Sequence, residues 1–449
     1  MTPRAAPAGE AASSEPADVA VVGGGMAGLV AANRCAQLGL RTVLLEKGAA
    51  PDGDSNARIS TGLFHLAWHP LDAPAGELEA ALVAATDGDI EPGTARAIAA
   101  NASAVLQWLI SEGVTFAPSG DDAAFRWQVT PHGANVGRRI DGDRGTYRMV
   151  RVLYRNLDAR HAAVHHASRV TGLAPSAAGW RLTVDGPARH VEARHVVLCD
   201  GGFQASGEML TRYIGPQGSG IVLRAAVTGT GDALRMGLAA GAATAGLGRF
   251  YGHILSRDAL HRDLWPYPVL DALCDQGLII DRWGRPLTAG FADGIQLANI
   301  LARTEDPRGW SVVVTAAAGA GASALDHLER LGGTVYRAGD ARRLAAGLGL
   351  PAGRLAAAVK QRLGAAAAAG ELVGVPIVPG ITVTMGGLAV GADGAVRADD
   401  GEVLAGLFAC GSACGGIQGG PRGGYLGGLA VAAVTAWITA ATVGRRAAP

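Results

Sequence analysis

The sequence predicts an α/β protein in which a smaller α+β module is inserted into a larger domain with a parallel sheet. Two observations carry this prediction. Residues 18–47 alternate an apolar strand, a glycine-rich turn, a helix and a second strand, the order typical of a parallel sheet covered by helices. Between residues 248 and 377 the composition changes and aromatic residues accumulate, after which the first pattern returns near Pro376. The 449 residues are sufficient for both parts.

The turn in the first segment has the spacing of a dinucleotide-binding loop. Gly23, Gly25 and Gly28 form G-x-G-x-x-G directly after the strand 18–22 and at the start of the helix 26–38. Gly23 permits the tight turn, Gly25 lets the backbone approach a pyrophosphate, and Gly28 lets helix and strand pack closely. Free N–H groups and the dipole at the helix N-terminus favour that anion.

An acidic residue completes this motif. Glu46 follows the second strand, about 20 residues after the last glycine, where its carboxylate can accept hydrogen bonds from ribose hydroxyls. Strand, turn, helix and acid together predict a Rossmann-like dinucleotide-binding domain; a glycine-rich turn in an ordinary α/β protein is the alternative. Met26, Ala27 and Lys47 flank these positions and are expected to contact the same cofactor.

Several polar or glycine-rich segments are predicted to line the cofactor as well. The loop 48–70 offers hydroxyl and amide groups, although a plain polar loop is the alternative interpretation. The apolar strand that begins at His195 runs directly into glycines, and a helix begins near residue 427, where free N–H groups could steady negative charge on the cofactor. No second complete glycine motif is present, so no separate nicotinamide domain is expected. The residues concerned are Ser55, Asn56, Ser60, Thr61, Gly62, Asp200, Gly201, Gly202, Gly427, Gly428 and Leu429.

Composition argues against several classes of partner. Apolar residues make up 49% of the chain and charged residues 17%, so a large core is easily built. The formal net charge is +0, which argues against nucleic acid or an anionic membrane surface as a main partner. The five cysteines are scattered, which fits a reducing compartment and predicts a cytoplasmic location. Cys410 and Cys414 lie close together, but no neighbouring ligand completes a metal site, so no metal is predicted.

The chain divides into four parts on this basis. Residues 1–16 are polar and rich in alanine and proline, which predicts a disordered leader without the features of a signal peptide. Residues 17–247 and 378–449 are predicted to form the cofactor domain, and residues 248–377 the inserted module. The apolar stretch 429–443 is expected to be too short and too rich in alanine for a membrane span.

A set of motifs occurs along the chain in a fixed order: GGGMAGLVAA, VVLCDGGF, GTGDALRMGLAAGA, TMGGL, and GLFACGS followed by GGYLGG. In these motifs the chain resembles the fumarate reductase/succinate dehydrogenase flavoprotein superfamily, FAD-binding type 2. It is most similar to the branch with tricarballylate dehydrogenase-like and 3-ketosteroid dehydrogenase-like members. The resemblance covers about residues 17–443. It implies an FAD domain built from both ends of the chain, an inserted capping domain, and an active site between them.

The resemblance also implies a type of reaction and further site residues. The reaction is hydride transfer between flavin N5 and a carbon of a C–C bond that a carboxylate or ketone activates, while an acid or base moves the partner proton. His253 falls where members have a substrate-binding histidine at the start of the cap; an ordinary cap histidine is the alternative. Further cofactor contacts implied in this way are Val170, Met385, Gly386, Gly411 and Ser412.

Three residues of the family pattern are replaced. Thr382 and Val383 stand where fumarate-reducing members have a histidine, and Asp293 or Gly294 is nearest to their proton-delivering arginine. Ser412 replaces a glutamate of the flavin loop. These replacements argue against fumarate reduction itself, and they leave open a catalytically degenerate FAD-binding scaffold or subunit.

Arg422 and Tyr425 remain as catalytic candidates. Arg422 resembles a C-terminal arginine that grips a substrate carboxylate in the family, and Tyr425 resembles a tyrosine that polarises a carbonyl or takes a proton. A nearby Arg422 charge would lower the pKa of Tyr425 from its usual value of about 10. Flavin binding or a structural role for Arg422, and packing for Tyr425, are the alternatives. Weaker candidates in the cap are Tyr251, Tyr267 and Asp271.

The predicted function is FAD-dependent dehydrogenation, or less favourably reduction, of a small carboxylate or cyclic ketone held by His253 and Arg422. Electrons would pass to a separate acceptor: a quinone, an iron–sulfur or cytochrome protein, or oxygen. A flavin-dependent oxygenase of a biosynthetic pathway is a second interpretation. Non-covalent FAD is predicted because His65 and His69 lie beyond the position, Ser55 to Arg58, where covalent members carry their histidine.

Overall fold

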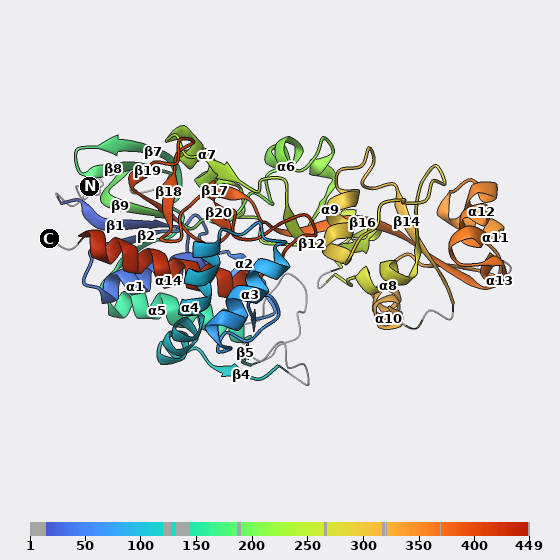
Figure 1. Ribbon diagram of the computed structural model, residues 1–449, viewed down its shortest axis with the longest axis horizontal. Coiled ribbons are helices and arrows are strands. Elements are labelled where there is room, and N and C mark those ends of the chain that lie inside the picture. The colour runs from blue at the N-terminus through green and yellow to red at the C-terminus, as the bar shows by residue number, and fades with distance from the viewer. Residues whose placement is uncertain are drawn as a thin grey trace, which may run out of the picture.

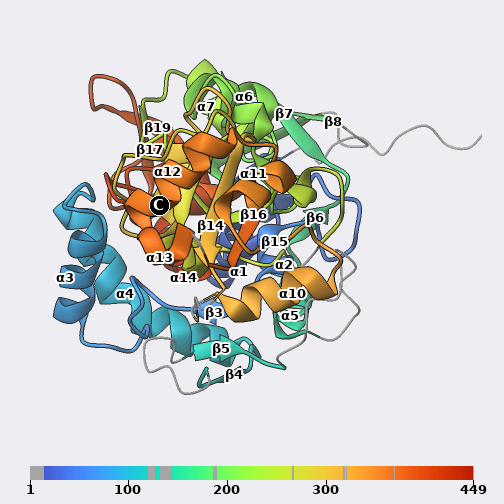
Figure 2. The same ribbon diagram turned by 90° about the vertical axis from the view of Figure 1, so that its right-hand side faces the viewer.

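The computed structural model describes residues 15–119, 127–131, 144–185, 190–264, 267–316, 319, 321–368 and 370–447 (Figure 1). Most of the proposed leader, residues 1–14, therefore lies outside the described residues. A larger lobe contains both ends of the described chain, and a smaller lobe extends from its opposite side (Figure 1). Seen from that side, helices of the smaller lobe lie nearest the viewer (Figure 2).

The larger lobe is built on an eight-stranded sheet in which β1 has a central position. The strand order is β18-β19-β9-β1-β2-β6, and the pairs β9–β1, β1–β2, β2–β6 and β19–β9 are parallel. The antiparallel strands β7 and β8 extend the sheet beside β9. The strands are β1 Ala17–Val22, β2 Thr42–Leu45, β6 Ala163–His165, β7 Arg169–Ser176, β8 Gly179–Asp185, β9 His190–Leu198, β18 Ala395–Arg397 and β19 Val403–Ala409.

Helices α1, α5 and α14 lie beneath this sheet, with α3 and α4 beyond them (Figure 1). Helix α1 follows β1 through the glycine turn and buries Leu29, Val30 and Ala31 against the sheet, so the predicted strand–turn–helix unit is confirmed. The helices of this lobe are α1 Met26–Gln37, α2 Asn56–Ile59, α3 Ala75–Ala85, α4 Pro92–Ser111, α5 Gly145–Ala159, α6 Gly207–Tyr213, α7 Asp232–Ala239 and α14 Gly428–Ala447.

Two small sheets close the larger lobe. One joins strands from the middle and the end of the chain in the order β11-β17-β20, and the other has the order β3-β5-β4. Their strands are β11 Thr244–Ala245, β17 Gly387–Ala389, β20 Cys414–Gly415, β3 Leu63–Phe64, β4 Phe116–Ala117 and β5 Trp127–Val129.

The smaller lobe confirms the predicted α+β module. Its six-stranded sheet has the order β10-β16-β14-β13, with β12 and β15 also paired to β16. The long strands β12 and β16 pair antiparallel and connect the two lobes, and β16 runs without a break through the predicted boundary at 377/378 (Figure 1). The elements are β10 Val222–Leu223, β12 Phe250–Ser256, β13 Leu278–Asp281, β14 Trp310–Thr315, β15 Tyr336–Ala338, β16 Leu372–Thr384, α8 Asp271–Gln276, α9 Gly294–Leu301, α10 Ala322–Arg330, α11 Ala341–Leu348, α12 Ala352–Arg362 and α13 Ala365–Ala368.

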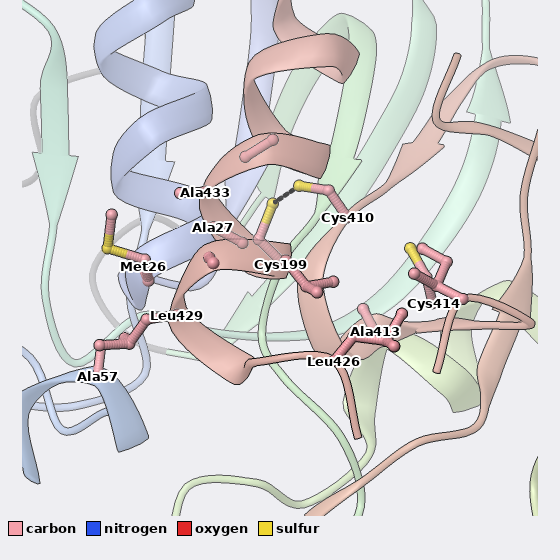
Figure 3. Packing of buried hydrophobic residues seen from close by; sticks show 14 of the residues in the cluster. Met26, Ala27, Ala57, Cys199, Cys410, Ala413, Cys414, Leu426, Leu429 and Ala433 are labelled. Carbon is pink, nitrogen blue, oxygen red and sulfur yellow. Dashed lines mark hydrogen bonds between the residues drawn. The ribbon is translucent and has the colours of Figure 1, made fainter. Parts of the chain in front are cut away.

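Buried side chains of α1, α14 and the ends of β9 and β19 form the part of the core that lies under the site (Figure 3). The five cysteines are free and buried, and the sulfurs of Cys199 and Cys410 lie 3.2 Å apart. Burial raises the pKa of the Cys199 thiol well above its usual value, so Cys199 is held as a neutral, packed thiol. Across the described ranges, no group of three or more His, Cys, Asp or Glu side chains could hold a metal ion.

The C-terminal helix α14 is longer than the sequence suggested. With 20 residues, it is long and apolar enough to cross a membrane by length and composition, so the expectation that the stretch is too short was wrong. However, 61% of its apolar window is buried inside the fold, where it packs against α1 and α4. This burial is what a core helix of a two-layer domain shows.

Candidate active site

A cavity of about 440 Å³ opens where the carboxyl ends of β1 and β9 meet the smaller lobe. Ligands of parallel α/β sheets bind at this edge, because the loops that leave neighbouring strands diverge there. The loop after β1 contributes Gly23 to Ala27, and the loop after β9 contributes Cys199 to Gly202. Tyr251 and Tyr267 reach the same cavity from the smaller lobe.

The first part of the cavity has the form of a pyrophosphate cradle. Helix α1 begins at Met26 with Gly25 as its N-cap, and no side chain caps its first turn. A Cβ atom on Gly28 would lie 1.8 Å from the carbonyl oxygen of Gly23, so only glycine permits this contact between helix and turn. The hydroxyl of Ser55 is buried without a hydrogen-bond partner and lines the cavity. A buried unpaired hydroxyl facing open N–H groups fits an anionic ligand at this end.

Glu46 holds the cradle from the adjacent strand. It is 4% exposed, lines the cavity, and accepts hydrogen bonds from the N–H groups of Gly24 and Gly48 at 2.5 and 2.6 Å. A carboxylate has about four lone-pair sites, so it can accept ribose hydroxyls in addition. The cradle and this acid together fit the dinucleotide that the motif predicts.

A buried charge cluster lies beside the cradle. Lys47 Nζ donates to Asp232 Oδ2 at 2.8 Å and lies 3.4 Å from Asp200 Oδ2. Burial raises the pKa of Asp200 to about 6, although Lys47 acts in the opposite direction. Burial also acts to raise the pKa of Asp232, but hydrogen bonds from Arg169 and Lys47 outweigh it and hold that pKa well below its usual value. The two carboxylates share one lysine, and Asp232 ionises more easily than Asp200 because Arg169 is bound to it as well.

Replacement of Asp200 by asparagine is expected to raise the unfolding free energy of the apoprotein, relative to the unchanged protein, progressively between pH 4 and 6. A carboxyl whose folded pKa is raised to about 6 stabilises the fold below its unfolded pKa, and this contribution is lost as the pH rises through 6. The shift corresponds to a cost of about 3 kcal/mol at neutral pH, which asparagine does not carry. Urea unfolding at pH 4.5, 6 and 8 measures the difference; a difference independent of pH would contradict this assignment.

The structure brings most of the predicted cofactor residues to this cavity and leaves others in the packing around it. Val170 and Met385 are buried away from the lining, and Gly28, Gly386, Gly411 and Gly427 lie where a Cβ atom would collide with neighbouring segments. The predicted direct contact of these residues with the cofactor is therefore corrected: they pack behind the segments that line the cavity. The predicted residues that line the cavity are Gly23, Gly25, Met26, Ala27, Glu46, Lys47, Ser55, Asn56, Ser60, Thr61, Gly62, Asp200, Gly201, Gly202, Ser412, Gly428 and Leu429.

Two stacked tyrosines line the cavity. The rings of Tyr251 and Tyr425 lie 3.8 Å apart with an angle of 13° between their planes. The hydroxyl of Tyr425 accepts a hydrogen bond of 2.8 Å from the N–H of Gly428 at the start of α14. Burial raises the pKa of Tyr425, although this N–H and Arg224 act to lower it. The expectation that Tyr425 has a lowered pKa is therefore wrong.

Arg224 is the residue that sequence analysis missed. Its side chain lines the cavity, Nη1 donates to Thr382 Oγ1 at 3.1 Å, and the buried Nε has no hydrogen-bond partner. Burial lowers the pKa of Arg224, while the nearby Tyr251 and Asp271 act to raise it. Within the described part of the chain, Arg224 forms no ion pair with a carboxylate, whereas the other cavity cation, Lys47, has two. The residue follows β10 in a stretch without a recognisable motif, and its only sequence signal is a charge among apolar residues.

Arg422 lies elsewhere. Its guanidinium is 60% exposed and paired with Asp87, with Nε donating to Oδ1 at 2.7 Å. It does not line the cavity, so the predicted grip of Arg422 on a substrate carboxylate is corrected to a surface ion pair that ties the glycine-rich loop to residue 87.

His253 also has a different place from the one expected. It does not line the cavity but lies behind Tyr251, between the hydroxyl of that residue at 2.9 Å and the carboxylate of Asp271 at 2.7 Å. The predicted direct binding of substrate is therefore corrected to a contact through Tyr251. Of the three weaker candidates, Tyr251 and Tyr267 reach the cavity and Asp271 lies behind them.

The structure also places the residues that stand where fumarate-reducing members have their histidine and their arginine. Thr382 and Val383 line the cavity and offer no proton donor other than one hydroxyl. Asp293 caps α9 through the N–H of Gln296. A Cβ atom on Gly294 would lie 1.9 Å from Cγ of Asp271, so the space at this position is filled by the carboxylate.

His65 lines the same cavity. Its ring stacks on Trp68 at 4.4 Å and meets Tyr425 edge-on at 5.8 Å. Burial lowers the pKa of His65 to about 4, so this imidazole is neutral at physiological pH. Ala67 and Trp68 have positive φ angles of 46° and 67°, a strained geometry that is common beside functional sites.

Comparison with known proteins agrees with this geometry. The family model described as "FAD binding domain" matches residues 18–425. The L-aspartate oxidase of Streptomyces coelicolor is 32% identical over 238 residues, which are 50% of this chain and 38% of that protein. The chain thus spans about two fifths of the length of this curated relative.

Solved structures share the fold at low sequence identity. The open conformation of a flavocytochrome c3 fumarate reductase has a TM-score of 0.71 at 19% identity, over 97% of this chain and 79% of that one. The 3-ketosteroid-Δ4-(5α)-dehydrogenase of Rhodococcus jostii RHA1 also has a TM-score of 0.71, at 18% identity, over 96% of this chain and 97% of that one. At these identities the likeness concerns the fold, and it confirms the predicted Rossmann-like domain with an inserted cap. With its glycine cradle, its acidic residue and a family match over most of its length, the chain belongs to the FAD binding domain family of flavoproteins, as its resemblance to the fumarate reductase/succinate dehydrogenase superfamily predicted.

Proposed function

We propose that the protein is an FAD-dependent oxidoreductase that acts on a C–C bond next to a carboxylate or a ketone. The observation that carries this proposal is Arg224, a buried cation with an unpaired Nε in a cavity continuous with the FAD cradle. A buried charge is costly without a partner of opposite charge, so an anionic oxygen of the substrate completes the site. Both a carboxylate and the enolate that develops from a ketone meet this requirement.

The residues of the cavity have separable tasks in such a reaction. When bound, FAD supplies a two-electron acceptor or donor of hydride. Arg224 and Thr382 hold the oxygen that carries negative charge, and the stacked Tyr251 and Tyr425 present an apolar face that excludes water. Tyr251 is the hydroxyl placed to exchange a proton with the substrate, because it lines the cavity and its partner His253 lies outside.

The proposal includes a separate electron acceptor, which is a quinone, an iron–sulfur or cytochrome protein, or oxygen. It is supported by the single complete dinucleotide motif of the sequence, which is assigned to FAD and leaves no second motif for a nicotinamide cofactor. We also propose a cytoplasmic location. It is supported by the five cysteines, which are all free, although the sulfurs of Cys199 and Cys410 lie only 3.2 Å apart.

Anaerobic titration of the purified protein with a panel of carboxylates and cyclic ketones tests the proposal. The relative from Streptomyces coelicolor is named an L-aspartate oxidase, so aspartate joins succinate and cyclic ketones in the panel. Bleaching of the flavin absorbance by one class is expected, because hydride transfer removes the oxidised chromophore. If the protein binds FAD tightly but no compound bleaches or reoxidises the flavin, a scaffold is favoured instead. Hydroxylation of the product that requires oxygen would favour an oxygenase.

Acid precipitation is expected to release the flavin into the supernatant, because we propose non-covalent attachment. His65 lines the cavity, but its Nδ1 accepts a hydrogen bond of 3.2 Å from the N–H of Trp68 and its ring is stacked on that residue. The absorbance of the supernatant measures the release. Flavin that stays with the pellet, and is freed from it in the His65→Ala variant, would contradict this proposal and identify the attachment.

A further inference from the structure

We propose that Asp271, His253 and Tyr251 form a proton relay that ends in the cavity, with Tyr251 as the group that exchanges the proton with the substrate. The inference rests on the proposed function and specifies how the proton that accompanies the hydride is moved. Tyr251 is the catalytic residue of this relay, and His253 and Asp271 are positioning residues that act through it.

Strand β12 places the first two members on one face. Tyr251 and His253 are two residues apart, and side chains at this spacing point to the same side of a strand. Gly252, between them, faces β16 so closely that a Cβ atom would lie 1.9 Å from the carbonyl oxygen of Gly380. The pair is therefore fixed by the close approach of the two strands that connect the lobes.

The third member is fixed from α8. Asp271 Oδ1 accepts a hydrogen bond of 2.8 Å from the N–H of Ile254, and Oδ2 lies 2.7 Å from His253 Nδ1. The absence of a side chain on Gly294 leaves the space that this carboxylate fills. Three independent elements, β12, α8 and the start of α9, thus hold one carboxylate against one imidazole.

These contacts fix the direction of the hydrogen bonds. A carboxylate only accepts, so Nδ1 of His253 carries a hydrogen and donates it to Asp271. Nε2 of the neutral ring is then an acceptor, and the Tyr251 hydroxyl donates to it at 2.9 Å. The order of acid, imidazole and hydroxyl is the one by which enzymes activate a hydroxyl through an adjacent base.

Tyr251 and Tyr425 differ in what their hydroxyls contact. The hydroxyl of Tyr425 accepts from the N–H of Gly428, whereas that of Tyr251 faces a base. Burial raises the pKa of Tyr251, so this phenol does not ionise alone. His253 can accept the phenolic proton of Tyr251 while the phenol oxygen receives a proton from the substrate, so no free tyrosinate has to form.

Dehydrogenation by this relay removes one proton and one hydride from the substrate. The substrate C–H bond breaks, its proton passes to the Tyr251 oxygen, and the Tyr251 proton passes to Nε2 of His253. The electron pair of that bond forms the new C=C bond as the adjacent carbon loses hydride to FAD, the two-electron oxidant. The imidazolium, stabilised by Asp271, then releases its proton to solvent. In reduction every step runs backwards.

The charges around the relay define its pH dependence. The groups that face Tyr251 are His253, Tyr425, Arg224 and Asp271. Asp275 and Asp293 are the further acids on α8 and at the start of α9, and the pKa of Asp275 is raised by burial and by its acidic neighbours. The relay works as a base only while His253 is neutral, so dehydrogenation stops once acid protonates that imidazole.

Tyr251→Phe, His253→Gln and Asp271→Asn test the relay, with His261→Gln as the control for an exposed histidine of the same lobe. In the FAD-loaded enzyme, the rate of flavin bleaching is expected to fall 10²- to 10⁴-fold in Tyr251→Phe, with substrate affinity changed less than about threefold. The acidic limb of the pH profile is expected to disappear in His253→Gln and to move in Asp271→Asn. His261→Gln is expected to match the unchanged protein.

A second measurement does not depend on turnover. The Nδ1–H proton of His253 is expected as a downfield NMR resonance that is absent in His253→Gln, is lost in Asp271→Asn and shifts in Tyr251→Phe. Absence of this resonance in the unchanged protein overturns the relay, and so does unchanged bleaching in Tyr251→Phe. If no compound of the panel bleaches the flavin of the unchanged protein while the resonance behaves as expected, the proposed function fails and the hydrogen-bonded relay stands.

Discussion

Gly28→Ala is expected to lower the affinity for FAD by at least about 100-fold. The new Cβ atom would lie 1.8 Å from the carbonyl oxygen and 2.9 Å from the carbonyl carbon of Gly23. Both are backbone atoms of the turn. Gly23 itself has a φ angle of 100°, and its N–H donates to the carbonyl oxygen of Leu45 at 2.8 Å, which ties the turn to β2. Helix α1 must therefore shift, and its N-terminus leaves the place where it meets the pyrophosphate.

FAD fluorescence quenching measures the affinity, and urea unfolding of the apoprotein is expected to show a loss of several kcal/mol, on the order of 3–5. Gly76→Ala is the matched control, because Gly76 lies in the first turn of α3 with no atom within 4 Å of its Cβ position. That variant is expected to bind FAD normally and to gain up to about 1 kcal/mol of stability. Normal FAD binding by Gly28→Ala would refute the role assigned to this glycine.

Gly24 offers an internal test of the same argument. Its Cβ atom would meet the hydroxyl of Tyr154 at 1.8 Å, which belongs to a side chain and can be removed. Tyr154→Phe is therefore expected to restore part of the FAD binding lost in Gly24→Ala, whereas it cannot rescue Gly28→Ala. The difference separates a collision with a side chain from a collision with the backbone.

The FAD half of the site could be predicted because its signals are local. The strand, the turn and the helix between residues 17 and 37 follow one another in sequence, so composition and spacing carry their geometry. Glu46 follows the adjacent parallel strand, and β1 pairs with β2 in a register that brings Val22 opposite Leu45. Few other arrangements of these residues satisfy both patterns.

The substrate half could not be predicted because its contacts are distant in sequence. Arg422 and Tyr425 are neighbours in the chain, yet Arg422 pairs with Asp87 while Tyr425 stacks on Tyr251. Nothing local distinguishes an arginine that pairs on the surface from one that faces the cavity. The spacing of Tyr251 and His253 did carry a signal, since alternate strand residues share a face. The position of Asp271 against them depends on how α8 packs on β12.

Replacement of Arg224 by glutamine is expected to lower kcat/KM for the substrate by roughly 10²- to 10³-fold. Removal of one partner from a buried, hydrogen-bonded charge pair costs about 2–5 kcal/mol, and each 1.4 kcal/mol is a factor of about ten. Arg224→Lys keeps the charge but not the Nε donor, so an intermediate loss of about tenfold is expected. Arg422→Gln is the control, because that arginine is paired with Asp87 at the surface, and its variant is expected to keep the affinity of the unchanged protein.

Stability separates this role of Arg224 from a structural one. In the apoprotein Arg224 is a buried charge without a carboxylate partner among the described residues, and its Nε is unpaired. Glutamine removes that charge, so the unfolding free energy of the apoprotein is expected to rise by about 1–3 kcal/mol while activity falls. Sites that bind charged ligands commonly show this opposition between stability and function. Loss of stability in Arg224→Gln would contradict the description of Arg224 as a buried charge without a partner. Loss of substrate affinity in Arg422→Gln would instead make Arg422 the substrate anchor, as the sequence alone predicted.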